Sequence, residues 1–312
     1  MKVLVLCHHH PNYVPDLLLH GLRKLLGDDV VDVPRKDILY RGLCGQYHLD
    51  PVPDLLPPDS GIDRSDIVGK VKARHFDLVL CDVRALDEQR ELLQANPRPL
   101  AVIDGEDGRS PIPAGPYAVL RRETDGSDSS IPLPMAMPSE VLDWIDRHAD
   151  APKTHSIGFL GSRSDQTPDR YGLLDELARR FPDALIGAWE MKAGNWRGRD
   201  AYYAGLQSCR AVLTLPGVGN DTFRYWEHAA CNAAHVAKRM PLLIPNDFRE
   251  SSEILRFSDL DELVRVVERV LGDEEQWPYY AYRSRSWLRA HHTTERRAQQ
   301  TLDRLTAAFQ LA

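Results

Sequence analysis

Short apolar runs alternate with longer amphipathic segments along this chain of 312 residues. In the first half, the runs near Val3, from Phe76 and from Leu100 predict strands, and VPDLLLHGLRKLLG has the spacing of a helix that buries one face. Strands that alternate with helices are typical of a parallel sheet with crossover helices. The pattern therefore predicts an α/β fold for the first half.

The same alternation begins again in the second half. The apolar runs SIGFLG, ALIGAW, AVLTL and PLLIP predict four more strands, with helical patterns between them. The proline-rich segment 131–155 reads as a linker, so we place a domain boundary near Ala151. The prediction is two Rossmann-like domains, at residues 1–150 and 151–312, with the terminal helix from Thr293 packing back across the first domain.

Charge and hydropathy exclude some classes of protein. A net charge of −7 argues against a protein held on DNA or on an anionic membrane by bulk electrostatics. Arg35, Lys36 and Arg41 leave a local basic groove open, so nucleic acid is kept as a less favoured partner. Because no apolar run reaches about 18 residues, no membrane span is expected.

The cysteines and the N-terminus indicate a compartment. The cysteines are odd in number and widely spaced, which favours buried free thiols over disulfides. They are Cys7, Cys44, Cys81, Cys209 and Cys231. The chain begins with the strand-like MKVLVLC, which lacks the features of a secretory signal. We therefore expect a cytoplasmic protein.

The segment LTLPGVGNDTFRYWEHAAC, residues 213–231, contains the strongest candidate binding site. An apolar strand leads through a glycine-rich turn into a helix. Gly217 and Gly219 would let backbone amides approach an anion, and Asn220 or Asp221 would cap the helix. The segment predicts a phosphate-binding turn, although an ordinary strand-to-helix connection has the same spacing.

Two side chains within the following helix strengthen the ligand interpretation. Arg224 is able to pair with phosphate, and Glu227 is able to accept hydrogen bonds from a ribose diol. Together they indicate a nucleoside diphosphate.

A second glycine-containing turn, GFLGSRSD, follows the first strand of the second domain. Gly158, Gly161, Ser162 and Arg163 would face the phosphates from the opposite side, and Lys192 in a later loop would also reach them. A purely structural turn is equally compatible with this sequence, and the loop that carries Lys192 is also typical of a mobile segment.

Three consecutive histidines, His8, His9 and His10, follow the first predicted strand, where open parallel sheets bind their ligands. A histidine suits a general base because its unperturbed pKa is about 6.5. At most two of three adjacent residues in an extended strand share a face. Loop histidines that pack against the helix are an equal alternative, and a metal site ranks low because no matching carboxylate is apparent.

The rival base lies in IDGEDG, at the end of the last clear strand of the first domain. Asp104, Glu106 and Asp107 are the candidates, and ordinary turn chemistry is the alternative. Arg121 and Arg122 in VLRRE follow, and at least one of them is expected to lie at a solvated strand end.

The second half resembles the donor domain of GT-B glycosyltransferases, most closely the spore-maturation-protein-like group near glycosyltransferase families one and four. The resemblance is carried by GNDTFRYWEHAAC, KRMPLLIPND, FSDLDELVRVVERVL and HHTTERRAQQTLDRL. Weaker similarity extends through MKVLVLCHHHP, IDGEDG, VLRRE and IPLPMAMP in the first half. The chain departs from many relatives at His235, eight positions after Glu227, where they carry a second acidic residue.

The resemblance implies a hexosyltransferase-like enzyme that moves a sugar from a nucleoside diphosphate sugar to an acceptor held between the domains, with no cofactor and no metal. Gly217, Gly219, Asn220 and Thr222 would hold the pyrophosphate, Arg224 would stabilise the leaving charge, and Glu227 would bind the ribose. His8, His9, Asp104 and Glu106 are the candidate bases.

Other functions fit the same fold. They are a nucleotide-sugar epimerase or hydrolase, and a nucleotide-sugar-binding protein without catalysis. The donor base and sugar stay open, and the acceptor is a saccharide, a small molecule or a protein.

Overall fold

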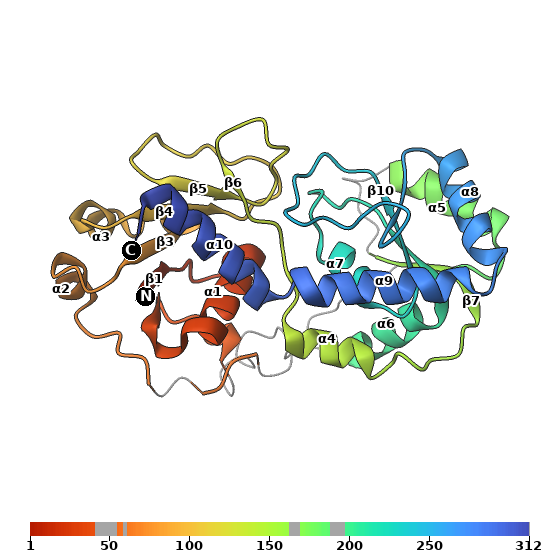
Figure 1. Ribbon diagram of the computed structural model, residues 1–312, viewed down its shortest axis with the longest axis horizontal. Coiled ribbons are helices and arrows are strands. Elements are labelled where there is room, and N and C mark those ends of the chain that lie inside the picture. The colour runs from red at the N-terminus through yellow and green to blue at the C-terminus, as the bar shows by residue number, and fades with distance from the viewer. Residues whose placement is uncertain (41–54, 59–60, 162–168, 188–196, 312) are drawn as a thin grey trace. The chain divides into compact units, whose positions relative to one another are not determined.

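The computed structural model describes residues 1–40, 55–58, 61–161, 169–187 and 197–311. These residues form two compact units, each built on a parallel sheet (Figure 1). Unit 1 comprises Met1–Pro138, Leu242–Pro245 and Thr293–Ala312, and unit 2 comprises Ser139–Pro241 and Asn246–His292. The predicted α/β fold class is confirmed.

The sheet of unit 1 has six described strands in the order β2-β1-β3-β4-β5-β6, all parallel. The strands are β1 (Val3–Leu6), β2 (Val30–Val33), β3 (Leu78–Asp82), β4 (Leu100–Asp104), β5 (Ala118–Arg121) and β6 (Ile131–Pro132). The helices are α1 (Tyr13–Leu26), α2 (Ile67–Lys72), α3 (Arg90–Ala95) and α10 (Thr294–Phe309). The chain adds β2 on one side of β1 and then β3 on the other, so the order reverses between β1 and β3.

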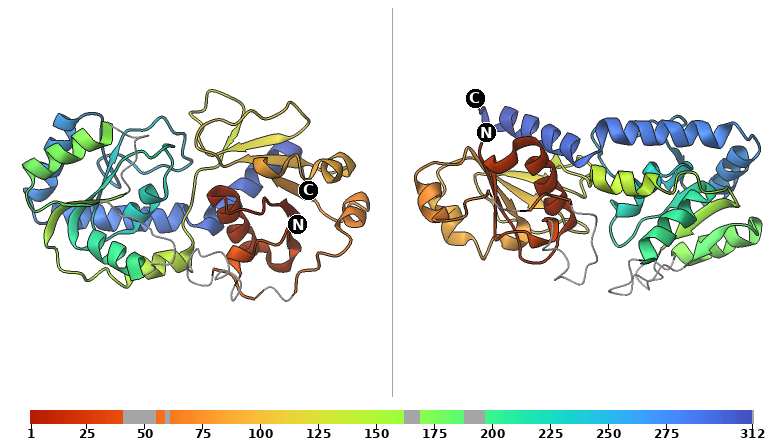
Figure 2. Two further views of the ribbon diagram at one scale, coloured as in Figure 1. Left: turned by 180° about the vertical axis from the view of Figure 1, so that it is seen from behind. Right: turned by 90° about the horizontal axis from the view of Figure 1, so that it is seen from below.

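The C-terminal helix α10 packs on α1 within unit 1, as the sequence pattern predicted (Figures 1 and 2). Gly21 permits this close approach, because a Cβ at that position would overlap the carbonyl oxygen of Thr294. His20 Nδ1 also lies 2.8 Å from Thr294 Oγ1, and both residues are fully buried. The last helix therefore completes the core of the first unit.

The sheet of unit 2 has five described strands in the order β11-β10-β9-β7-β8, again all parallel. They are β7 (His155–Leu160), β8 (Leu185–Gly187), β9 (Cys209–Thr214), β10 (Ala234–Lys238) and β11 (Leu255–Phe257). The helices are α4 (Ser139–Asp146), α5 (Asp169–Arg180), α6 (Arg197–Gln207), α7 (Phe223–Ala230), α8 (Leu260–Leu271) and α9 (Gln276–His291). Here the order reverses between β7 and β9.

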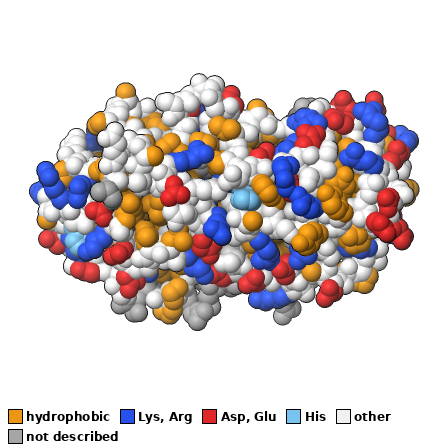
Figure 3. Space-filling view, in the orientation of Figure 1, with side chains coloured by type: hydrophobic (Ala, Val, Ile, Leu, Met, Phe, Trp, Pro, Cys, Tyr) orange, Lys and Arg blue, Asp and Glu red, His pale blue; other side chains and the backbone are white. Residues whose placement is uncertain are grey.

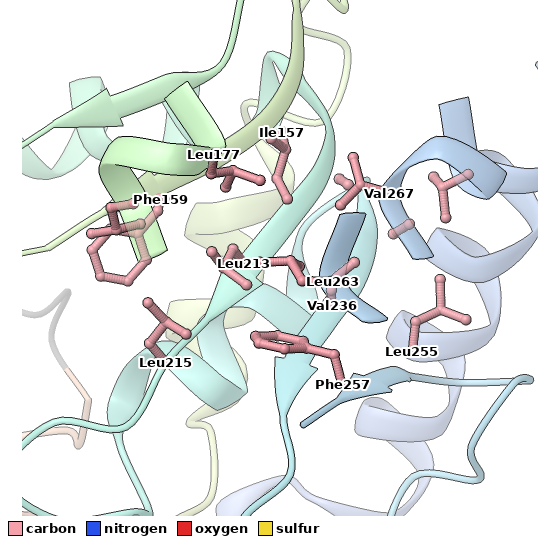
Figure 4. Packing of buried hydrophobic residues seen from close by; sticks show 14 of the residues in the cluster. Ile157, Phe159, Leu177, Leu213, Leu215, Val236, Leu255, Phe257, Leu263 and Val267 are labelled. Carbon is pink, nitrogen blue, oxygen red and sulfur yellow. The ribbon is translucent and has the colours of Figure 1, made fainter. Parts of the chain in front are cut away.

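The core of unit 2 joins the sheet to α5 and α8. Phe159 of β7, Leu213 of β9 and Phe257 of β11 pack with Leu177 and Val267 from these helices (Figure 4). Leu215, directly after β9, extends the same cluster under the turn that leads to α7. The turn is thus anchored by apolar packing at its start.

Two details of the predicted organisation are wrong. PLLIP forms no strand, because Pro241 and Pro245 lack N–H donors for a ladder; the strand there is β10, Ala234–Lys238. The expected linker contains β6 and the helix α4, whose Trp144 is buried, so it is ordered structure that packs on its surroundings.

The prediction of buried free thiols is confirmed for the four cysteines that the structure describes. Cys7, Cys81, Cys209 and Cys231 are buried free thiols, and Cys44 lies outside the described residues. Among the described helices, none is long and apolar enough to cross a membrane. On the face shown in Figure 3, basic and acidic side chains are interspersed over both units.

Candidate functional site

In unit 2, the turns after β7 and β9 flank the position where the strand order reverses, which is where open α/β sheets bind ligands. The turn after β9 closes on itself, because the Gly217 amide donates to the carbonyl of Gly219 at 2.8 Å. The Gly217 amide is therefore used inside the turn. A Cβ at Gly217 would lie 3.2 Å from Thr222 Cγ2, so this glycine allows the turn to approach the start of α7.

Helix α7 begins at Phe223, and its N-cap residue is Thr222. The predicted caps, Asn220 or Asp221, lie before this position. Asp221 is buried and instead accepts a hydrogen bond from Trp226 Nε1 at 2.8 Å. The Thr222 hydroxyl caps no amide and is buried without a hydrogen-bond partner among the described residues. The first amides of α7 and their partial positive charge therefore suit a bound anion.

Two arginines converge beside this helix start. Arg170, in the first turn of α5, and Arg224, in the first turn of α7, lie 5.6 Å and 5.8 Å from the centroid of the Phe159 ring. Arg170 donates to the carbonyl of Pro216, and the guanidinium carbon of Arg224 lies 3.7 Å from a Cβ built on Gly161. Burial, and then the charge of Arg224, lower the pKa of Arg170 to about 10. Two cations held this close favour an anion between them.

Glu227 lies one turn after Arg224 and is buried. Its carboxylate accepts hydrogen bonds from the hydroxyls of Tyr203 at 2.8 Å and Tyr202 at 3.2 Å. Burial, followed by the charge of Glu227, raises the pKa of both tyrosines well above the usual value, so both stay protonated donors. Each carboxylate oxygen retains capacity for a further hydrogen bond.

The other predicted residues of the donor site have different positions. Gly158 lies inside β7, where a Cβ would overlap Cys209 Sγ, so it serves packing within the sheet. Gly161 follows β7, and its amide donates to the carbonyl of Gly187 at 3.2 Å. Ser162, Arg163 and Lys192 lie outside the described residues.

In unit 1, polar side chains gather at the carboxyl ends of β1, β3 and β4. Asn12 Nδ2 lies 3.2 Å from both oxygens of Asp82 and 3.4 Å from Glu106 Oε1. Arg84 forms a bidentate ion pair with Glu106, with distances of 2.5 and 2.8 Å. Burial raises the pKa of Asp82, which is fully buried. The exposed end of this network is Glu106, which Arg84 and Asn12 hold in place.

The histidine segment directly follows β1, which ends at Leu6, so the alternation of an extended strand does not apply to it. The rings of His8, His9 and His10 cluster together, with centroids 4.1 Å apart between neighbours and 5.5 Å apart between His8 and His10. Lys36 Nζ donates to the carbonyls of His8 and His10 at 2.8 and 2.6 Å. Lys36 is therefore a buried support of this segment, which contradicts its predicted place in a basic groove; Arg41 lies outside the described residues.

The ion pair of Lys36 with Asp16, at 2.9 Å, joins this segment to α1. Burial raises the pKa of Asp16 to about 6, although Lys36 opposes the shift. The segment after β1 is thus connected to α1 by the ion pair between Lys36 and Asp16, and the pKa of Asp16 is raised.

His8, His9 and Glu88 form a group whose potential ligand atoms all lie within 4.8 Å of one another. A carboxylate is therefore present where the sequence indicated none. However, the backbone amide of His10 donates a hydrogen bond to His8 Nδ1 at 3.3 Å. The proton of neutral His8 is therefore on Nε2. Since Nε2 is the atom that faces Glu88, this tautomer does not suit metal binding.

Asp104 and its neighbours form a closed ion-pair cluster. Asp104 pairs in register with Arg121 across β4 and β5, is fully buried, and accepts from the Arg121 guanidinium at 2.5 Å. Arg122 is also buried and lies 2.8 Å from Asp107. The prediction of a solvated arginine here is therefore wrong, and Asp104 offers no exposed oxygen to a substrate.

Sequence alone does not single out Arg170, Asn12 or Asp82 as site residues. Arg170 becomes a candidate only because β7 and β9 are adjacent, which brings the starts of α5 and α7 together. Asp82 carried one usable signal, since it ends the buried strand LVLCD in the same way that Asp104 ends LAVID.

Comparison with known proteins adds a family match for part of the chain. Residues 170–303 match the model of a family described as glycosyl transferase-like. This range includes Arg170, Arg224 and Glu227. No curated protein matches the chain in sequence.

Solved structures match the whole chain in fold. A glycosyltransferase from Rickettsia africae has a TM-score of 0.60 at 9% identity, with 100% of this chain and 99% of that chain covered. HepE from Anabaena, described in complex with UDP, has a TM-score of 0.56 at 14% identity, covering 98% and 100%. Sucrose-phosphate synthase from Thermosynechococcus elongatus has a TM-score of 0.50 at 12% identity, covering 100% of both chains.

The fold is that of the GT-B glycosyltransferases. The match of residues 170–303 to the glycosyl transferase-like family adds a likeness in sequence to this likeness in fold. The spore-maturation-protein-like subgroup receives no separate support.

Proposed function

We propose that this protein transfers a sugar from a nucleoside diphosphate sugar to a hydroxyl-bearing acceptor, with the donor bound in unit 2. The observation that carries the proposal is the convergence of Arg170 and Arg224 on the start of α7. HepE, which shares the fold, is described in complexes with UDP and with UDP-glucose, and this makes a uridine diphosphate sugar the first donor to test.

The arginines would act on the leaving group. When the anomeric bond breaks, negative charge grows on the departing diphosphate, and fixed cations and helix amides stabilise that charge. Arg224 and the α7 N-terminus would supply this stabilisation, with Arg170 as a second cation close to the same Phe159 ring. A positive site of this kind performs the usual task of a metal ion, so we propose transfer without a metal.

Glu227 would bind the ribose. Tyr202 and Tyr203 hold its carboxylate in one orientation while leaving acceptor capacity for a diol. Gly219, Asn220 and Thr222 would line the turn that contacts the phosphates.

In unit 1, His9 would be the base that deprotonates the acceptor. Its side chain is 56% exposed, whereas Glu106 is engaged by Arg84 and 29% exposed. His8 is more buried, and burial lowers its pKa, so it suits a supporting role. Replacement of His9 by alanine should abolish release of nucleoside diphosphate in the presence of acceptor while donor binding is retained.

Donor binding is tested by calorimetry with uridine, guanosine, adenosine and thymidine diphosphates in the presence of EDTA. Binding of one nucleotide to the wild type and its loss in Arg224→Ala would support the proposal. Arg179→Ala is the matched control, because Arg179 lies on α5 and pairs at the surface with Glu176. Absence of binding by all four nucleotides, or equal binding by Arg224→Ala, would overturn the donor-site assignment.

A further inference from the structure

Three polar atoms within residues 222–228, which run from the N-cap of α7 to its last turn, are buried without a hydrogen-bond partner among the described residues. They are Thr222 Oγ1, Arg224 Nε and His228 Nε2. A buried polar group without a partner is unfavourable, so three of them within seven residues need an explanation. His228 is the most informative, because its side chain is fully buried and the proposed donor site does not yet use it.

His228 lies on the same face of α7 as Arg224. The two residues are four positions apart, which makes them neighbours on a helix surface. Because Cα–Cβ bonds tilt toward the helix N-terminus, the His228 side chain leaves α7 in the direction of the turn that carries Arg224. Burial lowers the pKa of His228, and the nearby His235 and Arg224 lower it further. The ring is therefore neutral.

The other nitrogen of His228 is fixed from beneath by Thr214, the last residue of β9. The Thr214 hydroxyl lies 2.8 Å from His228 Nδ1 and 3.1 Å from His235 Nε2. Burial lowers the pKa of His235 to about 3, so this ring is neutral as well. One hydroxyl between two neutral rings donates to one and accepts from the other.

This arrangement permits two hydrogen-bond states. In the first, Thr214 donates to His228 Nδ1, and His228 carries its proton on Nε2. In the second, Thr214 donates to His235, and His228 Nε2 is a bare acceptor. An anion at the start of α7 stabilises only the first state, because only then does His228 present an N–H group.

We propose that His228 is a further phosphate-binding residue, donating from Nε2 to the diphosphate held by Arg224, while Thr214 donates to His228 Nδ1 and accepts from His235. The inference rests on the proposed donor site and adds a residue to it. The interaction is a hydrogen bond without proton transfer, since the rings and the hydroxyl each keep one proton. Its partner is an oxygen of the diphosphate.

Two substitutions of His228 separate this role from a structural one. An asparagine amide reaches the position of Nδ1 and keeps the contact with Thr214, whereas a glutamine amide reaches the position of Nε2. His228→Asn should weaken binding of uridine diphosphate and of inorganic pyrophosphate by about tenfold or more, as expected for a hydrogen bond to a charged group. His228→Gln should bind both within a few-fold of the wild type.

The outcomes distinguish the two levels of the proposal. Equal binding by His228→Asn and the wild type, or equal loss in both variants, overturns the role of Nε2. If the wild type binds no nucleoside diphosphate, the proposed function itself fails. Thermal unfolding of both variants verifies that each is folded.

A second measurement reads the tautomer directly. Nitrogen NMR of the His228 ring in the complex with uridine diphosphate should show a protonated Nε2 and an unprotonated Nδ1. A structural role would not fix this state on ligand binding. An unprotonated Nε2 in the complex would overturn the inference.

Discussion

At the scale of single residues, buried charge in both units is compensated by nearby polar groups. Lys36 in unit 1 is engaged by Asp16 and two carbonyl groups, and Asp104 is paired with Arg121. In unit 2, the buried carboxylate of Glu227 accepts hydrogen bonds from Tyr202 and Tyr203. Buried guanidinium Nε atoms without a partner among the described residues occur in both units, at Arg23 and Arg121 as well as at Arg224, so such an atom does not by itself mark the donor site.

The buried histidines of unit 2 predict sensitivity to acid. Burial, and then the charge of Arg256, lower the pKa of His235 to about 3, against about 6.5 in an unfolded chain. Between these values the unfolded state binds one more proton, so stability rises with pH and is fully present above pH 6.5. His235→Gln should reduce the slope of unfolding free energy against pH by up to about 1.4 kcal/mol per unit.

Urea unfolding monitored between pH 4 and 7 measures this slope. His75→Gln, which changes an exposed histidine of unit 1, is the control and should leave it unchanged. An identical slope in His235→Gln and the wild type would show that the ring is already charged in the folded protein.

At the scale of elements, two glycines inside helices have opposite surroundings. In α1, Gly21 faces the backbone of α10, whereas in α5, Gly172 is exposed and a Cβ there would meet nothing within 4 Å. The same substitution therefore tests packing at one site and helix propensity at the other.

Gly21→Ala should destabilise unit 1 by about 1–3 kcal/mol, because the methyl group would overlap the Thr294 carbonyl and force α10 to move. Gly172→Ala should stabilise α5 by about 0.5–1 kcal/mol through better helix propensity. Denaturant unfolding measures both changes. A neutral Gly21→Ala would contradict the close packing of α1 and α10.

At the scale of the whole molecule, the chain crosses from unit 2 back to unit 1 near its end. Thr293 pairs with Met137 in an isolated bridge, and α10 buries Ala298, Leu302 and Leu305 in unit 1. The integrity of the first unit therefore depends on residues at the far end of the sequence.

A chain that ends at His292 should lose hydrogen-exchange protection in α1 and β1 while unit 2 keeps its protection. The physical reason is exposure of the apolar face of α1 that α10 covers. A chain that ends at Phe309 serves as the control and should behave as the full chain does. Retained protection of α1 after removal of α10 would contradict this dependence.

The sequence by itself determined the types of most elements and the α/β class, because apolar runs and helical periodicity are local properties. It failed where local signals compete. PLLIP is apolar but has prolines where a ladder needs donors, and AHVAK forms β10 despite His235 and Lys238. It also predicted Arg224 and Glu227 as candidate site residues, since a glycine-rich turn before a helix is a local signal.

Only the tertiary structure decided which residues act together. Arg170 reaches Arg224 because β7 and β9 are neighbours in the sheet. Glu227 of α7 meets Tyr202 and Tyr203 of α6 because the fold brings these side chains from two separate helices together. The order of strands and the packing of helices depend on burial across the whole unit, and no spacing in the sequence specifies which distant side chains share one buried site.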